Sequence, residues 1–226
     1  MANHLDLEEQ EQLDQLKHFW REWGNAITWG LIVVLGAFAS WNLYQYWQRN
    51  QAAQAAAMYD EVERVVKSED MAKLDRAMAD MKDKFGGTTY AHQAGLLAAR
   101  VYFEAGNVEA AKAALAWVAQ KSGDEGYQAI ARLRLSGVLA QTKAYDEALK
   151  QLSEAFPGDF VALAADRRAD IFALQGKKAE ARAEYEKAYK AFDERTEYRR
   201  LVEFKLNALG VNPREADASA AVEGKK

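Results

Sequence analysis

A stretch without a single charged residue, from position 23 to position 48, constrains this chain more than any other feature of its sequence. Its most apolar part, residues 27–46, supplies the roughly 20 residues that an α-helix needs to cross about 30 Å of hydrocarbon. Aromatic rings gather at both ends, as they do at the two headgroup levels of a membrane. They are Trp20, Trp23 and Trp29 at one end, and Trp41, Tyr44, Tyr46 and Trp47 at the other. The sequence therefore predicts one transmembrane helix over residues 24–48.

Two other interpretations compete for the same stretch, a cleaved signal peptide and a buried core helix. Ala53, Gln54 and Ala55 offer a small-x-small cleavage pattern. A signal peptide has a basic start and an apolar run of roughly 7 to 15 residues, whereas this start is acidic and the run is longer. An uncleaved anchor is therefore favoured. Lys17 and Arg21 lie before the span and Arg49 alone lies close behind it, which predicts a cytoplasmic N-terminus.

One face of the predicted span carries mostly small residues at spacings of three and four. They are Ala26, Gly30, Val33, Ala37 and Ser40. Helices in lipid associate where small residues let their backbones approach closely, so this face is a candidate docking site for another membrane helix. The alternative, that small residues are simply common in membrane helices, stays open.

Residues 1–23 form an acidic segment that is predicted to be cytoplasmic. Leu13, Leu16, Trp20 and Trp23 share one helical face, which indicates an amphipathic helix over about residues 8–23 that runs into the span. Such a helix suits either the membrane surface or a partner.

The chain beyond the span is rich in Ala, Glu, Lys and Arg and has no run of alternating β-branched residues, which predicts helices throughout. Three segments share one pattern there. Their equivalent alanines Ala111, Ala148 and Ala181 lie 37 and 33 positions apart, close to the tetratricopeptide period of about 34. The fold class is therefore predicted to be all-α, a single N-terminal transmembrane helix followed by a tetratricopeptide-like α-solenoid.

Each repeat is interpreted as a helix–turn–helix unit. Small residues on the first helix, Ala99, Ser136 and Ala169, are expected to meet the alanines of the second. Residues 52–67 and 70–84 are expected to form a degenerate leading pair, and residues 196–209 a last helix that Gly210 ends. The helical domain is thus placed at 49–209, followed by a polar tail over 210–226 that is expected to be disordered.

The sequence offers no recognisable catalytic chemistry. His4, His18 and His92 lie far apart without metal-ligand spacing, no phosphate-binding loop is present, and cysteine is absent. The formal charge of -4 comes with interspersed signs rather than a basic stripe, which argues against nucleic-acid binding. We therefore expect no enzyme, no catalytic residue, no metal and no cofactor. An enzyme whose site goes unrecognised is the rival interpretation.

Function is expected to come from the concave surface that a solenoid builds from the first helix of each pair. The partner-binding candidates on it are Gln93, Leu96, Arg100, Phe103, Ile130, Leu133, Asp166 and Asp170. Apolar residues in the middle of such a surface suit a non-native or extended polypeptide. Alternatively, Ile130 and Leu133 pack between repeats.

The order of these parts resembles a known family. The resemblance rests on Leu16-Lys17-His18-Phe19-Trp20 and Trp23-Gly24-Asn25 before the span, and on Thr89-Tyr90-Ala91 with Ala94 at the opening of the repeats. It is to the ancillary SecYEG translocon subunits, the YfgM-like proteins of Gram-negative inner membranes, and covers the chain up to about residue 209.

The resemblance implies a single-pass inner-membrane protein with a cytoplasmic N-terminus and a periplasmic repeat domain. It further implies association with the SecYEG translocon and with a PpiD-like membrane-anchored periplasmic chaperone, assisting unfolded or nascent exported polypeptides as they leave the channel. The alternative is an envelope scaffold with one dedicated partner, for example in outer-membrane assembly.

Overall fold

The computed structural model of the chain describes residues 7–214. Within them it contains nine α-helices and no strand, which confirms the all-α prediction. The first helix is α1 (Leu7–Lys67), and the chain divides after Ala53 into two units. Most of α1 belongs to the first unit, while its last residues, from Gln54 onward, belong to the second.

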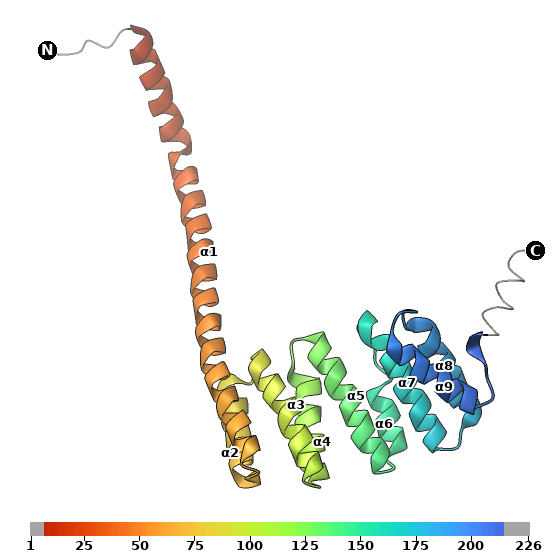
Figure 1. Ribbon diagram of the computed structural model, residues 1–226. Coiled ribbons are helices and arrows are strands. Elements are labelled where there is room, and N and C mark those ends of the chain that lie inside the picture. The colour runs from red at the N-terminus through yellow and green to blue at the C-terminus, as the bar shows by residue number, and fades with distance from the viewer. Residues whose placement is uncertain (1–6, 215–226) are drawn as a thin grey trace, which may run out of the picture. The chain divides into compact units, whose positions relative to one another are not determined.

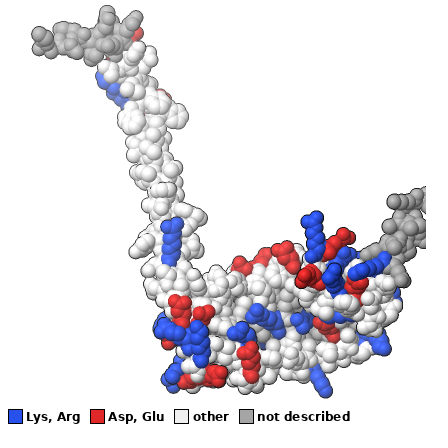
Figure 2. All heavy atoms as spheres, in the orientation of Figure 1, with Lys and Arg blue, Asp and Glu red and all other residues white. Residues whose placement is uncertain are grey.

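The first unit holds the expected membrane span. Over the described residues, α1 alone is long and apolar enough to cross a membrane, with a mean hydropathy of 1.6 over its best window of 18 residues. None of that window is buried inside the protein, as is expected of a lipid-facing helix and not of a core helix. Figure 2 shows this part of α1 almost free of charged side chains.

The second unit is an array of helices stacked in chain order (Figure 1). After the end of α1 it consists of α2 (Met71–Phe85), α3 (Thr89–Glu104), α4 (Val108–Lys121), α5 (Glu125–Gln141), α6 (Tyr145–Gln151), α7 (Gly158–Leu174), α8 (Lys178–Ala191) and α9 (Glu197–Ala208). From α2 to α9 each helix contacts the next one in sequence, and α5 also contacts both α3 and α7. The helices α3, α5 and α7 are therefore the first helices of three consecutive pairs, which is the arrangement that the repeat pattern predicts.

The three repeats turn between their helices in the same way. Gly106, Lys143 and Gly176 occupy equivalent positions, and all three adopt a positive φ, of 79°, 61° and 75°. Behind each of them a backbone N–H reaches back to a carbonyl in the last turn of the first helix, the Schellman arrangement that satisfies helix-end carbonyls. These bonds run from Asn107 to Tyr102 (2.8 Å), from Ala144 to Leu139 (2.9 Å) and from Lys177 to Phe172 (2.9 Å).

The small residues of the repeat pattern lie in the core, where they let paired helices approach closely. Buried alanines and serine are Ala99, Ser136 and Ala169 on the first helices and Ala111, Ala148 and Ala181 on the second. One apolar cluster extends from Val62 to Ile171, and a second joins α7, α8 and α9 around Tyr185 and Leu206. Each pair thus buries apolar side chains both between its own two helices and against the neighbouring pairs.

The second repeat departs from the pattern at its end. Helix α6 stops at Gln151, and Ala155, which lies beyond it, is exposed. Pro157 disfavours helical backbone in the residue before it, and the buried Arg132 takes up the freed backbone by donating to the Ala155 carbonyl at 3.0 Å.

The beginning of the expected tail contributes to the core. Val211 and Pro213 are buried, and Val211 belongs to the cluster around α9. Residues 215–226 of that tail, like residues 1–6 of the acidic segment, lie outside the described residues.

Candidate partner-binding groove

A groove of about 570 Å³ opens on the face built by the first helices of the pairs. Its walls come from α3 and α5, with contributions from the end of α1 and from α7. It is lined by Tyr59, Gln93, Leu96, Leu97, Ala99, Arg100, Phe103, Leu115, Leu133, Arg134, Gly137, Val138, Gln141 and Arg167. The apolar side chains outnumber the polar ones, and the lining contains neither Asp nor Glu.

Side-chain caps at the starts of α3 and α5 and one hydrogen bond between these helices position the apolar lining. Helix α3 begins where Thr88 accepts a hydrogen bond from the N–H of Ala91, and α5 begins where Asp124 accepts from Tyr127. Across the groove, the Gln93 amide donates a 2.6 Å hydrogen bond to the Tyr127 hydroxyl. This bond fixes α3 against α5 and so sets the width of the groove at one end.

Three arginines give the groove its charge. Arg100 lies 3.7 Å from the Glu104 carboxylate in an exposed pair, which contributes little binding energy in water. Neither Arg134 nor Arg167 forms a hydrogen bond or ion pair with any residue in the described range 7–214. Arg167 lies beside Gly137, where an added Cβ would make an ordinary van der Waals contact with it, 3.7 Å from its Nη1.

Five of the eight predicted partner-binding residues meet in this groove. They are Gln93, Leu96, Arg100, Phe103 and Leu133. Ile130 lies elsewhere: it packs against the core cluster, the alternative left open from the sequence. Leu133 both lines the groove and packs on that cluster.

The remaining two, Asp166 and Asp170, lie inside the array rather than on the groove. Asp166 is 2% exposed, accepts from the Tyr198 hydroxyl at 2.9 Å, and lies 2.8 Å from Lys205 Nζ. Asp170 accepts from Tyr185 at 2.6 Å and from the same Lys205 at 2.7 Å. Burial raises the pKa of Asp166, and the hydrogen bonds from Lys205 and Tyr198 oppose that rise. These contacts join α7 to α8 and α9.

Several lining residues were missed from the sequence, among them Leu97, Arg134 and Arg167. A signal for them existed, because all three stand two positions before the small residue of the first helix in their repeat. Assigning the position two residues before that small residue to the concave surface in every repeat would have identified all three. Tyr59 comes from the end of α1, where the leading pair is too degenerate for this register.

The small-residue face of the predicted span is open in the structure. Ala26, Gly30, Val33, Ala37 and Ser40 are all exposed. An added Cβ at Gly30 would find no atom within 4 Å. The face is therefore free for the helix docking that the sequence predicts.

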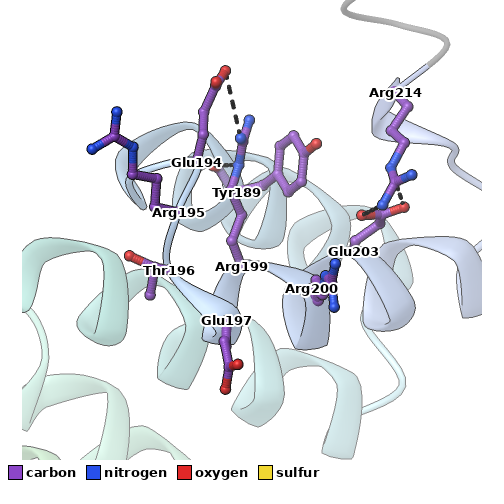
Figure 3. A pocket seen from close by; sticks show the side chains of 9 residues that line it. All are labelled: Tyr189, Glu194, Arg195, Thr196, Glu197, Arg199, Arg200, Glu203 and Arg214. Atoms are coloured by element: carbon purple, nitrogen blue, oxygen red, sulfur yellow. Dashed lines mark hydrogen bonds and ion pairs between the residues drawn. The ribbon is translucent and has the colours of Figure 1, made fainter.

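A second hollow, of about 700 Å³, lies at α8 and α9 (Figure 3). It is rich in arginine, but Arg199 faces Glu194 at 3.6 Å and Arg214 faces Glu203 at 2.7 Å. Figure 3 shows both pairs, with the Arg199 guanidinium also against the Tyr189 ring, 4.1 Å from its centroid. Because two of its four arginines are paired and Tyr189 is the one large apolar side chain in its lining, this hollow is the weaker candidate for a polypeptide.

The side chains that could ligate a metal are scattered in the part of the chain that the structure describes. There, no three side chains of His, Cys, Asp or Glu gather closely enough to hold a metal ion. His92, one of the three scattered histidines, is buried against Trp117 with its Nδ1 3.3 Å from Ser122 Oγ. The arrangement of the groove supports binding, by apolar contact and positive charge.

Comparison with known proteins gives a consistent result. A family model described as "Tetratricopeptide repeat-like domain" matches residues 17–211, which confirms the predicted repeat fold. Curated relatives are named "Ancillary SecYEG translocon subunit". The protein of Neisseria gonorrhoeae is 31% identical over 92% of this chain and 100% of its own length. That of Haemophilus influenzae is 31% identical over 90% and 98%, and that of Escherichia coli 28% over 90% and 97%. No solved structure matches the chain.

Proposed function

We infer the function from one premise: this chain belongs to the family of ancillary SecYEG translocon subunits. It is a membrane-anchored tetratricopeptide adaptor that associates with the translocon. We propose that it works by binding, without catalysis: its groove receives unfolded segments of exported polypeptides as they leave the channel. The observation that carries this proposal is the open groove, whose floor is apolar and whose lining has no acid.

The groove suits a polypeptide that has not yet folded. Phe103 and Leu133 line the groove as half-buried apolar side chains, and the buried Leu96 lies beside them, so a client's apolar side chains find apolar contacts there. Apolar area removed from water contributes about 25 cal/mol per Å², so a few side chains of a client give weak binding that releases easily. Weak and reversible contact is what a protein that hands clients onward needs.

We further propose that the anchor lies in the inner membrane, with the N-terminus in the cytoplasm and the repeat unit in the periplasm. Lys17 and Arg21 before the span outnumber Arg49 behind it, which favours this orientation. The repeat unit then lies on the side where exported chains emerge. An anchor that keeps it near the channel raises the effective concentration of clients to the millimolar range, which offsets weak affinity.

The small-residue face from Ala26 to Ser40 is proposed to dock the anchor onto a neighbouring membrane helix. The proposed neighbours are a helix of the SecYEG translocon or the anchor of a PpiD-like periplasmic chaperone. If the anchors of the two proteins lie side by side, a client released from the groove is close to the binding surface of the chaperone.

Site-specific photocrosslinking in living cells tests these proposals. Probes at Gly30 on the anchor and at Phe103 in the groove are compared with a control probe at Glu180, which is exposed on α8. We expect Gly30 to capture a translocon subunit or the chaperone, and Phe103 to capture many different exported chains. One unrelated protein captured at both positions would instead identify an envelope scaffold with a dedicated partner.

Removal of residues 1–48 tests the tether separately. The remaining repeat unit is expected to stay helical, because its core clusters begin at Val62. It is also expected to lose copurification with the channel. Undiminished copurification of the shortened chain would contradict the tethering proposal.

A further inference from the structure

We propose that the groove selects client segments in which a carboxylate lies next to a large apolar side chain. This inference rests on the proposed function, since it names the chemistry of the polypeptide that the same groove receives. Its occupant is thus an extended acidic and apolar segment, and segments rich in Lys or Arg bind more weakly.

The charge of the lining is the first observation. Arg100, Arg134 and Arg167 line the groove together, and no Asp or Glu lines it. The chain as a whole carries more acids than bases, 34 against 30, so a surface with three bases and no acid departs from its average composition. A potential of one sign over a groove attracts ligands of the opposite sign and repels those of its own.

The free state of two of these arginines is the second observation. Among the described residues, most of the other buried or half-buried arginines have partners: Arg132 pairs with Glu154 at 2.8 Å and Arg168 with Glu184 at 2.8 Å. The exposed Arg134 and the half-buried Arg167 form no hydrogen bond or ion pair within residues 7–214, although the charge of Arg167 acts on Tyr198, where it opposes the rise in pKa that burial causes. Their donors are therefore available to a ligand, and a guanidinium can hold a carboxylate through two parallel hydrogen bonds.

Their place in the repeats is the third observation. Arg134 and Arg167 occupy the same position of successive repeats, on α5 and α7, so both project from the concave surface. The apolar side chains Leu96, Phe103 and Leu133 lie in the same groove. A segment that covers these apolar residues therefore meets free cations along the same surface, and this juxtaposition requires a ligand with both chemistries.

The size of the effect follows from exposure. Arg134 is exposed and Arg167 half-buried, so each contact with a carboxylate is an ion pair close to water, weak singly and screened by salt. Two such pairs together give a preference of about tenfold for an acidic segment over its amide counterpart. Charge here sets which segments bind, while the apolar floor supplies contact that is common to all of them.

Peptide binding to the full chain in nanodiscs of phosphatidylcholine measures this preference. Three labelled peptides share one apolar sequence and differ at two positions, which hold Asp, Asn or Lys. Fluorescence anisotropy should give the tightest binding for the Asp peptide, about tenfold over the Asn peptide, with the Lys peptide weakest. The advantage of the Asp peptide should shrink as salt rises.

Variants assign the preference to the groove. The double substitution R134Q with R167Q should remove the Asp preference and leave the Asn peptide bound as before. The pair R134K with R167K should keep most of it, because the charge is retained. R76Q, at an exposed arginine of α2 outside the groove, is the matched control, and far-UV circular dichroism checks that each variant is folded.

The outcomes separate this inference from the proposed function. Equal binding of the Asp and Asn peptides, with both lost on replacing Phe103 by Asp, would overturn the charge preference and leave the groove as a polypeptide site. Binding of no peptide, or binding that the Phe103 substitution does not change, would overturn both. A preference for Asp that survives in R134Q with R167Q would also overturn the inference.

Discussion

Lys205 on α9 places its Nζ 2.8 Å from Oδ1 of Asp166 on α7, a residue 39 positions earlier whose side chain is 3% exposed. The same ammonium group lies 2.7 Å from Asp170. The last helix is thus attached to the array by a nearly buried ion pair as well as by the apolar contacts of Val202 and Leu206. The folded structure of the C-terminal end therefore depends on both the ion pair and the apolar contacts.

Replacing Lys205 by Met should destabilise this end of the array by about 3 kcal/mol, because it leaves the buried Asp166 carboxylate without the positive charge that pairs with it. Urea unfolding followed by circular dichroism measures the loss. Adding Asp166→Asn should recover part of it, since the unpaired charge is then gone. Lys190→Met, at an exposed residue of α8, is the control and should change stability by less than about 0.5 kcal/mol. An equal loss in both Lys variants would contradict the assignment.

Replacing Lys143 by Gly should stabilise the protein by about 0.5 to 1 kcal/mol. Lys143 has a φ of 61°, a conformation that costs a residue with a Cβ about 1 to 2 kcal/mol. Glycine removes this cost, but it also makes the unfolded chain more flexible, and that entropy offsets part of the stabilisation. Thermal unfolding checks the direction. The reverse change, Gly176→Ala at the equivalent turn, should destabilise, and a gain there would show that the shared turn geometry does not govern stability.

Replacing Gly95 by Ala should destabilise the protein by about 1 to 3 kcal/mol through overpacking between α3 and α4. An added Cβ at Gly95 would lie 2.6 Å from Cγ2 of Val118 and 3.1 Å from Cζ3 of Trp117. Gly123→Ala is the control, because a Cβ there meets nothing within 4 Å. Combining Gly95→Ala with Val118→Ala should restore part of the loss, since the smaller side chain makes room.

Stability should fall as the pH drops below about 6.5, and His92 should cause a measurable part of that fall. Burial lowers the pKa of His92 below its ordinary value, so the unfolded chain binds a proton that the folded chain refuses. The contribution of His92 is therefore complete above the unfolded pKa and is lost as the pH falls. Urea unfolding at several pH values should show a shallower slope for His92→Asn. An unchanged slope would mean that other groups control this range.

The helical class and the repeat register follow directly from the sequence. Alanine spacing and the turn glycines Gly106 and Gly176 mark the pairs, because close helix contact and left-handed turns each tolerate few residue types. Lys143 is the informative exception: it adopts the same turn although its residue type gives no sign of it. The neighbouring repeats, not the local sequence, identify that turn.

The candidate site could be predicted only in part. Leu96 and Phe103 line the groove because the helical face that they occupy was predicted correctly. Asp166 instead points inward to Lys205, a partner 39 positions away. No local pattern indicates that a carboxylate will be neutralised by a base so distant in sequence. The free arginines Arg134 and Arg167 were missed for the opposite reason, since charged residues on a helix are usually assigned to solvent.

The groove takes its lining from residues as far apart as Tyr59 and Arg167, on helices that from α2 onward each contact the next one in sequence, while α5 also contacts α3 and α7 along the array. Its width is therefore a mechanical property of the array, set by how readily α3, α5 and α7 bend relative to one another. A client that bridges these helices must resist that bending, so binding and elastic stiffness are thermodynamically coupled. Substitutions far from the groove that loosen a contact between two helix pairs should therefore lower the affinity of the groove for a polypeptide. A polypeptide bound in the groove should in turn make the array stiffer.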